Sequence, residues 1–214
     1  MEKKKNISMA VIKRLPKYHR YLKELLKNNI DKISSKELSE KIGFTASQIR
    51  QDLNNFGDFG QQGYGYNVRD LYDQIGAILG LTKEYNAVII GAGNLGQAIA
   101  NYTYFQDIGF NMRAMFERNP KLIGLRIRNV EVRDIDVLDE FLKEELIDVG
   151  IICVPKGSAQ DACDTLVANG VKAIWNFAPI DLKVPEGIVV ENVNLSESLL
   201  TMTCLLNGKG VSNN

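Results

Sequence analysis

The chain has 214 residues, enough for one large domain or two small ones, and its 45% hydrophobic and 24% charged residues exclude global disorder and fibrous repeats. The formal net charge is zero, no apolar run reaches the ~20 residues that a bilayer-spanning helix needs, and no signal-type stretch follows the amino terminus, so we expect a cytoplasmic protein. Three cysteines without metal-ligand spacing and a single histidine argue against a metal site and against histidine-based acid–base catalysis.

The net charge of zero conceals an uneven distribution along the chain. Residues 1–82 hold 14 Lys and Arg against 9 Asp and Glu, a net charge of +5, whereas residues 83–214 hold 12 against 17, a net charge of −5. This division favours a first domain, 1–82, that meets a polyanion. The patterns described below divide the rest into a second domain over 83–193 and a C-terminal helix and tail over 194–214. A chance division of surface charge is the alternative.

The first domain begins with two predicted helices. Over residues 14–28, leucines and a tyrosine recur at helical spacing and predict a core-facing helix with Pro16 in its first turn. A capping box of Ser34 and Glu37 opens a short second helix, which Gly43 ends.

A third short helix follows this glycine-containing turn. Thr45 and Gln48 offer a second capping box, and Ala46, Ile49, Leu53 and Phe56 form its buried stripe. Two short helices joined in this way are typical of a helix-turn-helix, whose second helix enters the major groove of DNA. Arg, Gln and Asn can hydrogen-bond base edges, although any polar helix surface has a similar composition. The predicted DNA-facing residues of this helix are Ser47, Gln48, Arg50, Gln51 and Asn54.

Glycines alternate with aromatic residues over 57–68, which predicts a β-hairpin and hence a winged helix. Gln61 and Gln62 at its tip are predicted to touch sugar and phosphate, with a plain turn as the alternative. A further helix is predicted over 69–79, and residues 80–82 mark the domain boundary.

The second domain opens with a strand, a glycine-rich turn and a helix in the order that dinucleotide binding requires. Residues 87–90 are apolar, the next six are Gly91, Ala92, Gly93, Asn94, Leu95 and Gly96, and a helix is predicted to about residue 105. Gly91 permits the tight turn, Gly93 lets the backbone approach a pyrophosphate, and Gly96 lets the helix pack on the strand. The pattern predicts an α/β domain with a doubly wound parallel sheet of the Rossmann type.

The position of an acidic residue favours one coenzyme over another. Glu117 ends the next predicted strand, 112–116, and lies 21 residues beyond Gly96, where a carboxylate grips the ribose hydroxyls and favours NAD over NADP. Arg118 beside it could accept a 2′-phosphate, so NADP stays open as the less favoured alternative. An exposed charged pair at a strand end is the alternative without a ligand.

Further strands are predicted at 130–132, 149–154, 171–175 and 188–193, with helices at 137–145 and 158–169. Ligands of such sheets lie outside the carboxyl ends of the strands. We therefore expect the nicotinamide to lie against Val154 and Pro155, and against the turn formed by Phe177, Ala178 and Pro179.

The last helix is apolar over most of its circumference, with Leu195, Leu199, Met202 and Leu206 on one stripe. Such a helix needs partners on two sides, which predicts a dimer, and a DNA-binding dimer needs a palindrome. Packing within its own chain is the alternative.

The chain resembles the Rex family of bacterial redox-sensing transcriptional repressors along nearly its whole length, most of all the clostridial members. The motifs that carry the resemblance are Arg14-Leu15-Pro16-Lys17-Tyr18, Ile33-Ser34-Ser35-Lys36-Glu37-Leu38, Gln48-Ile49-Arg50-Gln51-Asp52-Leu53, Phe56-Gly57-Asp58-Phe59-Gly60, Gly91-Ala92-Gly93-Asn94-Leu95-Gly96 and Trp175-Asn176-Phe177-Ala178-Pro179.

The resemblance implies a homodimer that binds operator DNA through the winged helix, with Lys17 at the DNA, and that senses the NADH/NAD⁺ ratio through the Rossmann domain. It also implies an exchange of C-terminal helices between subunits and derepression of fermentation genes when NADH accumulates. It places Arg20 and Tyr102 near Asn194 at an interdomain contact that couples the two sites, and Tyr102 is also predicted to contact the cofactor. The alternative has Tyr102 packed in the core and Arg20 in solvent.

The chain departs from the family pattern at four positions. Gln51 and Gln62 stand where many members have basic residues, which affects base preference or salt dependence. Glu117 replaces the usual Asp and keeps the charge. Asn194 replaces the common Asp, which puts the charged form of the coupling in doubt.

Two other functions compete with this one. An NAD-dependent dehydrogenase would need an acid–base residue, but the single histidine, His19, lies in the first helix and about 110 residues remain for the nucleotide domain. We therefore predict no catalytic residue. A Rossmann protein that binds coenzyme A or another nucleotide, with the winged helix contacting a protein, is the better alternative.

Overall fold

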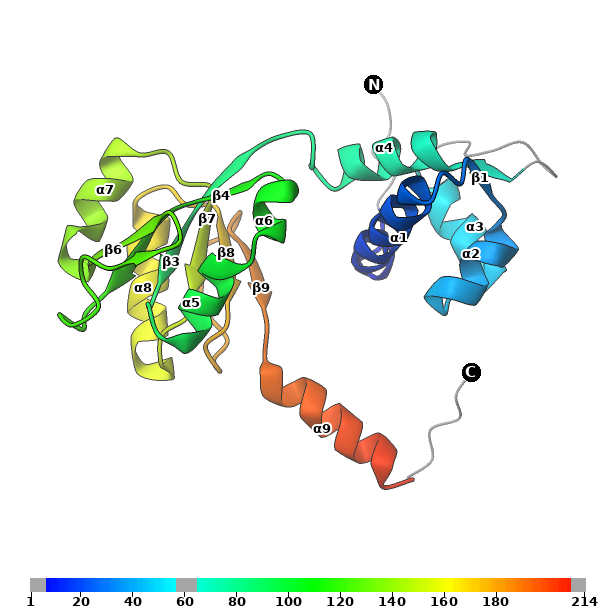
Figure 1. Ribbon diagram of the computed structural model, residues 1–214. Helices are drawn as coiled ribbons and strands as arrows, with labels where there is room; N and C mark the ends of the chain where they lie inside the picture. Colours follow the sequence, from blue (N-terminus) through cyan, green and yellow to red (C-terminus); the bar gives the residue numbers. More distant parts are fainter. Residues whose placement is uncertain (1–6, 57–64, 209–214) are drawn as a thin grey trace. The chain divides into compact units, whose positions relative to one another are not determined.

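The computed structural model describes residues 7–56 and 65–208 and divides into two units, Met1–Lys83 and Glu84–Asn214 (Figure 1). The described elements of the first unit, in chain order, are α1 (Met9–Lys27), β1 (Lys32–Ile33), α2 (Ser35–Ile42), α3 (Ala46–Asn54), β2 (Tyr66–Asn67) and α4 (Val68–Ile78).

Helix α1 begins earlier than its apolar pattern predicts. The Ser8 side chain caps it by accepting a hydrogen bond from the Val11 N–H at 3.4 Å. Pro16 therefore lies in the helix interior, and its predicted place in the first turn is wrong. The helix accommodates this proline at an exposed position, and Ile12, four residues before it, is exposed as well.

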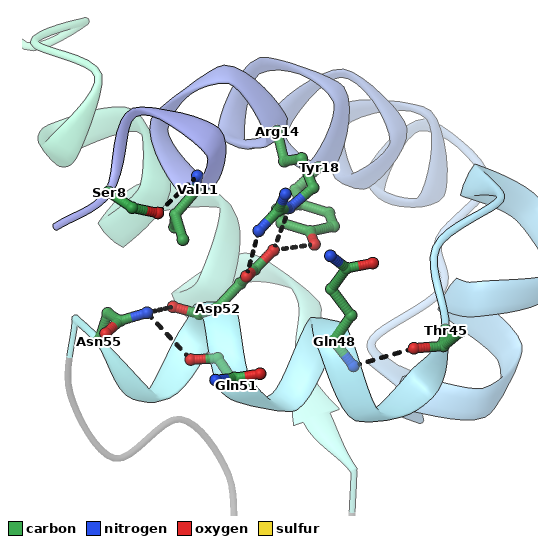
Figure 2. Close-up of polar contacts among 9 residues, drawn as sticks. All are labelled: Ser8, Val11, Arg14, Tyr18, Thr45, Gln48, Gln51, Asp52 and Asn55. Carbon is green, nitrogen blue, oxygen red and sulfur yellow. Dashed lines mark hydrogen bonds and ion pairs between the residues drawn. The ribbon is translucent and has the colours of Figure 1, made fainter.

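The helix-turn-helix forms as predicted, apart from one cap. Both halves of the Ser34–Glu37 capping box are present, and Gly43 ends α2 in the left-handed conformation with φ of 74°. At α3, the Thr45 hydroxyl accepts from the Gln48 N–H at 3.1 Å. The second bond of a capping box, from the Thr45 N–H to the Gln48 side chain, is not present among the described residues. The second box is therefore only half formed, because the Gln48 side chain points toward α1 (Figure 2).

Most of the predicted hairpin, residues 57–64, lies outside the described residues. Its described end, β2, pairs antiparallel with β1, with Tyr66 opposite Ile33. Val68 belongs to α4 instead of the hairpin, because the Asn67 side chain accepts from the Asp70 N–H at 3.1 Å and starts the helix there.

A buried carboxylate joins α1 to α3 (Figure 2). The Arg14 Nε and Nη2 atoms donate to the two oxygens of Asp52 at 2.6 and 2.7 Å, and the Tyr18 hydroxyl donates to the same carboxylate at 2.7 Å. Asp52 is 2% exposed and Tyr18 is fully buried. Burial and the hydrogen bond to Asp52 raise the pKa of Tyr18, so the phenol stays a donor and the orientation of α3 on α1 is fixed.

Helix α1 also packs on α4 through the chain's only histidine. The His19 ring stacks on Tyr72 with 4.2 Å between ring centroids. Burial and the nearby Lys23 lower the pKa of His19, against a smaller opposing effect of Asp73, and keep the imidazole neutral near pH 7.

The second unit is a doubly wound α/β sheet. Its described elements are β3 (Tyr85–Ile90), α5 (Asn94–Asn101), α6 (Tyr104–Asp107), β4 (Phe110–Glu117), β5 (Arg126–Ile127), β6 (Val130–Asp134), the 3-10 helix η1 (Ile135–Val137), α7 (Leu138–Glu144), β7 (Val149–Ile152), α8 (Lys156–Ala168), β8 (Ala173–Asn176), β9 (Val189–Asn192) and α9 (Leu195–Leu206).

The strand order is β5-β6-β4-β3-β7-β8-β9, and only the short β5 is antiparallel to its neighbour. The order reverses between β3 and β7, as in sheets that bind dinucleotides. Along β3, Val88 and Ile90 pack toward α7 and α8, whereas Ala87 and Ile89 pack toward α5. Helices thus cover both faces of the sheet (Figure 1), and the predicted fold class is confirmed.

The helix predicted to run to residue 105 is interrupted. Helix α5 ends at Asn101, Tyr102 is extended, and α6 begins at Tyr104. The interruption brings the Phe105 ring edge-on to Trp175, with 5.6 Å between centroids.

Helix α9 is exposed along its whole length in this chain. Leu199, Leu200 and Leu206 are 60, 66 and 77% exposed, and none of the helix's residues is buried. Packing against the described part of its own chain, the alternative considered from the sequence, is therefore not observed. No helix among the described residues combines the length and hydropathy required to cross a membrane.

Removing the Asp52 carboxylate tests what holds the first unit together. We expect Asp52→Ala to lower the local free energy of unfolding of α1 and α3 by about 3–5 kcal/mol, because it leaves the Arg14 charge and the Tyr18 hydroxyl without their partner. Amide hydrogen exchange in the full chain measures this energy. Glu40→Ala, at an exposed position of α2, is the control and should stay within about 0.5 kcal/mol of the parent. An equally small effect of Asp52→Ala would contradict the prediction.

Candidate nucleotide and nucleic-acid sites

The turn between β3 and α5 has no room for side chains at two of its glycines. Gly91 has φ of 102°, and a Cβ atom there would lie 2.7 Å from the Cys153 carbonyl oxygen. A Cβ atom on Gly96 would collide with the Gly91 carbonyl oxygen. Gly93 differs, since nothing lies within 4 Å of a Cβ atom placed on it. The close contacts at Gly91 and Gly96 agree with the tight turn and the close packing predicted for them, whereas the approach of a pyrophosphate to Gly93 stays a prediction.

The N-terminus of α5 faces this open space. Gly93 is the N-cap and provides no side-chain hydrogen bond to the first turn. The N–H groups of the first turn and the helix dipole there favour an anion such as a pyrophosphate. The Gln97 side-chain amide donates a hydrogen bond to the Ala92 carbonyl at 2.8 Å and so stabilises the turn.

Glu117 ends β4 beside this turn and is bonded to it. One carboxylate oxygen accepts from the Ala92 N–H at 2.7 Å, and the other accepts from the Arg118 and Asn119 N–H groups at 2.8 and 3.0 Å. Burial raises the pKa of Glu117, but the three backbone N–H groups outweigh burial and leave the pKa below its usual value. The carboxylate is therefore ionised and held in place.

A cavity of about 470 Å³ lies at the carboxyl ends of β3, β4, β6 and β7. Five of the residues predicted to bind a cofactor line it, namely Gly91, Glu117, Arg118, Val154 and Pro155. Residues that the sequence analysis did not predict at a cofactor complete the wall, namely Ile90, Phe116, Ile135, Asp136, Leu138, Asp139, Ser158, Asp161, Ala162 and Thr165. The strand order could have identified those after β6, because β6 lies next to β4.

The other predicted cofactor residues do not line this cavity. Phe177, Ala178 and Pro179 follow β8, and the Phe177 N–H donates to the Ile152 carbonyl at 2.9 Å, which holds their turn beside the end of β7. The Phe177 ring lies 4.6 Å from that of Trp175. This turn therefore lies at the same edge of the sheet as the cavity, beside the end of β7.

Ala92, Gly93, Asn94, Leu95 and Gly96 form the glycine turn itself and the start of α5. Cys153, at the end of β7, packs in the apolar layer beneath the turn. Burial raises the pKa of its thiol to about 12, so the thiol stays protonated near neutrality.

The three residues expected to couple the sites lie apart in the chain. Arg20 is an exposed residue of the first unit, so its contact with Tyr102 and Asn194 stays a prediction. Tyr102 is 56% exposed, which contradicts the alternative that it packs in the core. Its ring lies edge-on to Phe105 at 4.9 Å. Asn194 caps α9 by accepting from the Ser196 N–H at 3.0 Å.

The outward face of α3 presents polar side chains. Arg50 donates to the Ser35 hydroxyl at 2.9 Å, which links it to the start of α2. Four predicted DNA-contacting residues of α3, namely Ser47, Arg50, Gln51 and Asn54, are exposed. Lys17 of α1 is also exposed, with its Nζ atom 4.9 Å from the centre of the Phe44 ring.

Gln48 is only partly exposed and, with Gln51, borders a polar hollow of about 260 Å³ (Figure 2). Gln61 and Gln62, predicted at the wing tip, lie outside the described residues. Within the described part of the chain, no group of three or more His, Cys, Asp or Glu side chains is arranged to hold a metal ion.

Two family models match the chain. One, described as a putative DNA-binding protein N-terminus, matches residues 6–54, and the other, described as a CoA binding domain, matches residues 82–180. The first match lies within the first unit, and the second begins at residue 82, two residues before the second unit.

Solved structures of RSP, a Rex-family repressor, resemble this chain. RSP in complex with β-NAD⁺ and operator DNA is 62% identical, with a TM-score of 0.91, over 96% of this chain and 94% of that one. RSP in complex with β-NADH is 59% identical, with a TM-score of 0.87, over 96% of each chain.

Curated relatives match over nearly the whole length. The redox-sensing transcriptional repressor Rex of Clostridium novyi is 71% identical over 97% of this chain and 99% of its own length. That of Clostridium acetobutylicum is 70% identical over 96% of both chains. These relatives are named repressors and not enzymes. The chain belongs to the Rex family of redox-sensing transcriptional repressors.

Proposed function

We propose that the chain binds operator DNA as a homodimer and releases it when NADH binds, so that the NADH/NAD⁺ ratio controls genes of fermentation and NADH reoxidation. The observation that supports this most is the pair of RSP structures, one with β-NAD⁺ and operator DNA and the other with β-NADH. The cytoplasm, where such DNA lies, is then the site of action.

For DNA, the proposal assigns base contacts to the exposed face of α3, with Arg50 as the principal donor and Gln51 and Asn54 beside it. Arg can bond guanine with two hydrogen bonds, and Gln or Asn can do the same with adenine. Ser47, Gln48, Lys17, Gln61 and Gln62 are assigned contacts to base edges or to the phosphate backbone.

For the coenzyme, the pyrophosphate lies over Gly93 at the N-terminus of α5, the adenosine occupies the 470 Å³ cavity, and Glu117 accepts from the ribose hydroxyls. Glu117, Asp136, Asp139 and Asp161 outnumber Arg118 around this cavity. The proposal is therefore NAD(H) over NADP(H), because a 2′-phosphate would meet an excess of negative charge.

The nicotinamide lies between Val154, Pro155 and the turn of Phe177, Ala178 and Pro179. Removing the positively charged oxidised ring from water costs more than removing the neutral reduced one, so we expect NADH to bind more tightly than NAD⁺. A preference of about 1.4 kcal/mol would shift a two-state equilibrium tenfold.

Homodimerisation is proposed from α9, whose leucines are exposed along the whole helix. A palindromic operator would match the symmetry of two helix-turn-helix units. The name of the second family model favours coenzyme A as the competing ligand, so the experiments include it.

The first prediction from the proposed function concerns the unaltered protein. A gel shift on DNA from upstream of its own gene should give a complex that NADH dissociates at a lower concentration than NADPH, NAD⁺ or coenzyme A. Dissociation by coenzyme A at the lowest concentration would favour the competing ligand, and equal effects of NADH and NADPH would overturn the ribose argument.

The second prediction concerns α3. We expect Arg50→Ala to weaken operator binding by roughly 1–3 kcal/mol, while leaving NADH binding unchanged. Arg126→Ala removes the same charge from an exposed position of the second unit and should have a smaller effect. Fluorescence anisotropy with labelled operator measures both affinities. Unchanged affinity of Arg50→Ala would remove this residue from base contacts.

The third prediction concerns the coenzyme site. Gly93→Val should keep the fold, because the space around this position is open in the described chain, but it should block the pyrophosphate and abolish NADH binding. Gly157→Ala, at another open position, is the control.

Glu117→Ala should weaken NADH more than NADPH, whereas Glu117→Asp should keep the preference because it keeps the charge. Titration of NADH fluorescence measures the affinities. Parental NADH binding by Gly93→Val, or an unaltered NADH/NADPH preference in Glu117→Ala, would refute the placement of the coenzyme.

A further inference from the structure

A buried asparagine holds the turn on the nicotinamide side of the crevice. Asn176 is fully buried at the end of β8. Its side-chain oxygen accepts from the Ala178 N–H at 3.0 Å, and its Nδ2 donates to the Ile180 carbonyl at 2.8 Å and to the Ala178 carbonyl at 3.2 Å. This amide therefore makes three of the hydrogen bonds that hold the turn, in addition to the main-chain bond from the Phe177 N–H to the Ile152 carbonyl.

The same amide reaches the neighbouring strand. Its Nδ2 also donates to the side-chain oxygen of Asn192 at 2.9 Å, and the two residues are register partners in β8 and β9. The Asn176 carbonyl accepts from the Val193 N–H at 2.8 Å. The next residue, Asn194, caps α9 through Ser196 and donates to Glu197 at 3.1 Å. Hydrogen bonds thus connect the turn to Asn192 and Val193, and the residue that follows them, Asn194, caps α9.

The Nδ2 atom of Asn176 has two hydrogens for three acceptors. When the Ala178 or Ile180 carbonyl moves, the strength of the hydrogen bond from Asn176 to Asn192 must change, because the three acceptors compete for the same two hydrogens. Strands β8 and β9 pair through main-chain groups. The side-chain hydrogen bond between Asn176 and Asn192 is therefore not needed to hold the two strands together. A change in the position of the turn would therefore alter the hydrogen bond to Asn192 in β9, two residues before the cap of α9.

We propose that Asn176 and Asn192 are positioning residues that couple occupancy of the nicotinamide side to α9. The inference rests on the proposed function and names a route for the regulation of that site. It requires that NADH and NAD⁺ leave the turn in different positions, because a ligand shifts an equilibrium only by its differential affinity for the two states.

The test alters Asn192, which is exposed and not assigned to coenzyme or DNA contacts. We expect Asn192→Ala to bind NADH, and to bind operator without coenzyme, within about twofold of the parent. The ratio of operator Kd values with and without saturating NADH should fall at least about fivefold. Asn192→Asp keeps an oxygen acceptor and should keep the parental ratio.

Asn86→Ala is the matched control, since it removes a side-chain hydrogen bond, to the Leu146 carbonyl at 3.1 Å, at the opposite end of the sheet. It should keep the parental ratio. A parental ratio in Asn192→Ala would overturn the coupling role, as would an equal fall in Asn86→Ala. If the unaltered protein does not release operator with NADH, the proposed function fails first, and the coupling role falls with it.

Hydrogen exchange in the unaltered protein tests the same route without any substitution. NADH should change the exchange rates of the Ala178 and Val193 N–H groups together, because both bond to Asn176. A change at Ala178 with none at Val193 would overturn the proposal, whatever the stability of the variants.

Discussion

The close approach of backbone to backbone at the turn between β3 and α5 is the constraint on which the nucleotide unit depends. At Gly91 the backbone passes close to the Cys153 carbonyl, and at Gly96 it passes close to the Gly91 carbonyl. Neither position therefore accepts a Cβ atom. Only with this turn does α5 begin at the crevice where the strand order reverses. Glu117 then reaches the Ala92 N–H, and the carboxylate and the turn hold each other in place.

Apolar burial forms the cores of both units, but buried polar groups fix how their elements meet. Asp52 determines how α3 lies on α1, and Asn176 determines the turn beyond β8. Hydrophobic contacts tolerate small rotations, whereas hydrogen bonds restrict the directions in which their donors and acceptors can point. The orientation of α3, which carries the residues proposed to contact DNA, and the position of the turn beyond β8 therefore depend on buried polar groups.

Features encoded by neighbouring residues could be predicted from the sequence. The Ser34–Glu37 box, Gly43 and the glycine turn each depend on a few consecutive residues, and the apolar strands identified the sheet. Asp52 could not be predicted, because its partner Arg14 lies 38 residues away and a carboxylate in a helix is normally exposed. The cavity wall contributed by α8 also depends on packing over a distance, which periodicity along one helix does not reveal.

The burial of His19 against Tyr72 has a consequence for what this protein can sense. Histidine is the side chain whose ordinary pKa lies nearest to physiological pH, and the chain has one. Because burial and the nearby Lys23 lower the pKa of His19, the imidazole is mainly uncharged near pH 7. A small change of pH around neutrality therefore adds little histidine charge to the basic unit, and we expect this side chain to contribute little pH dependence to the attraction of that unit for a polyanion.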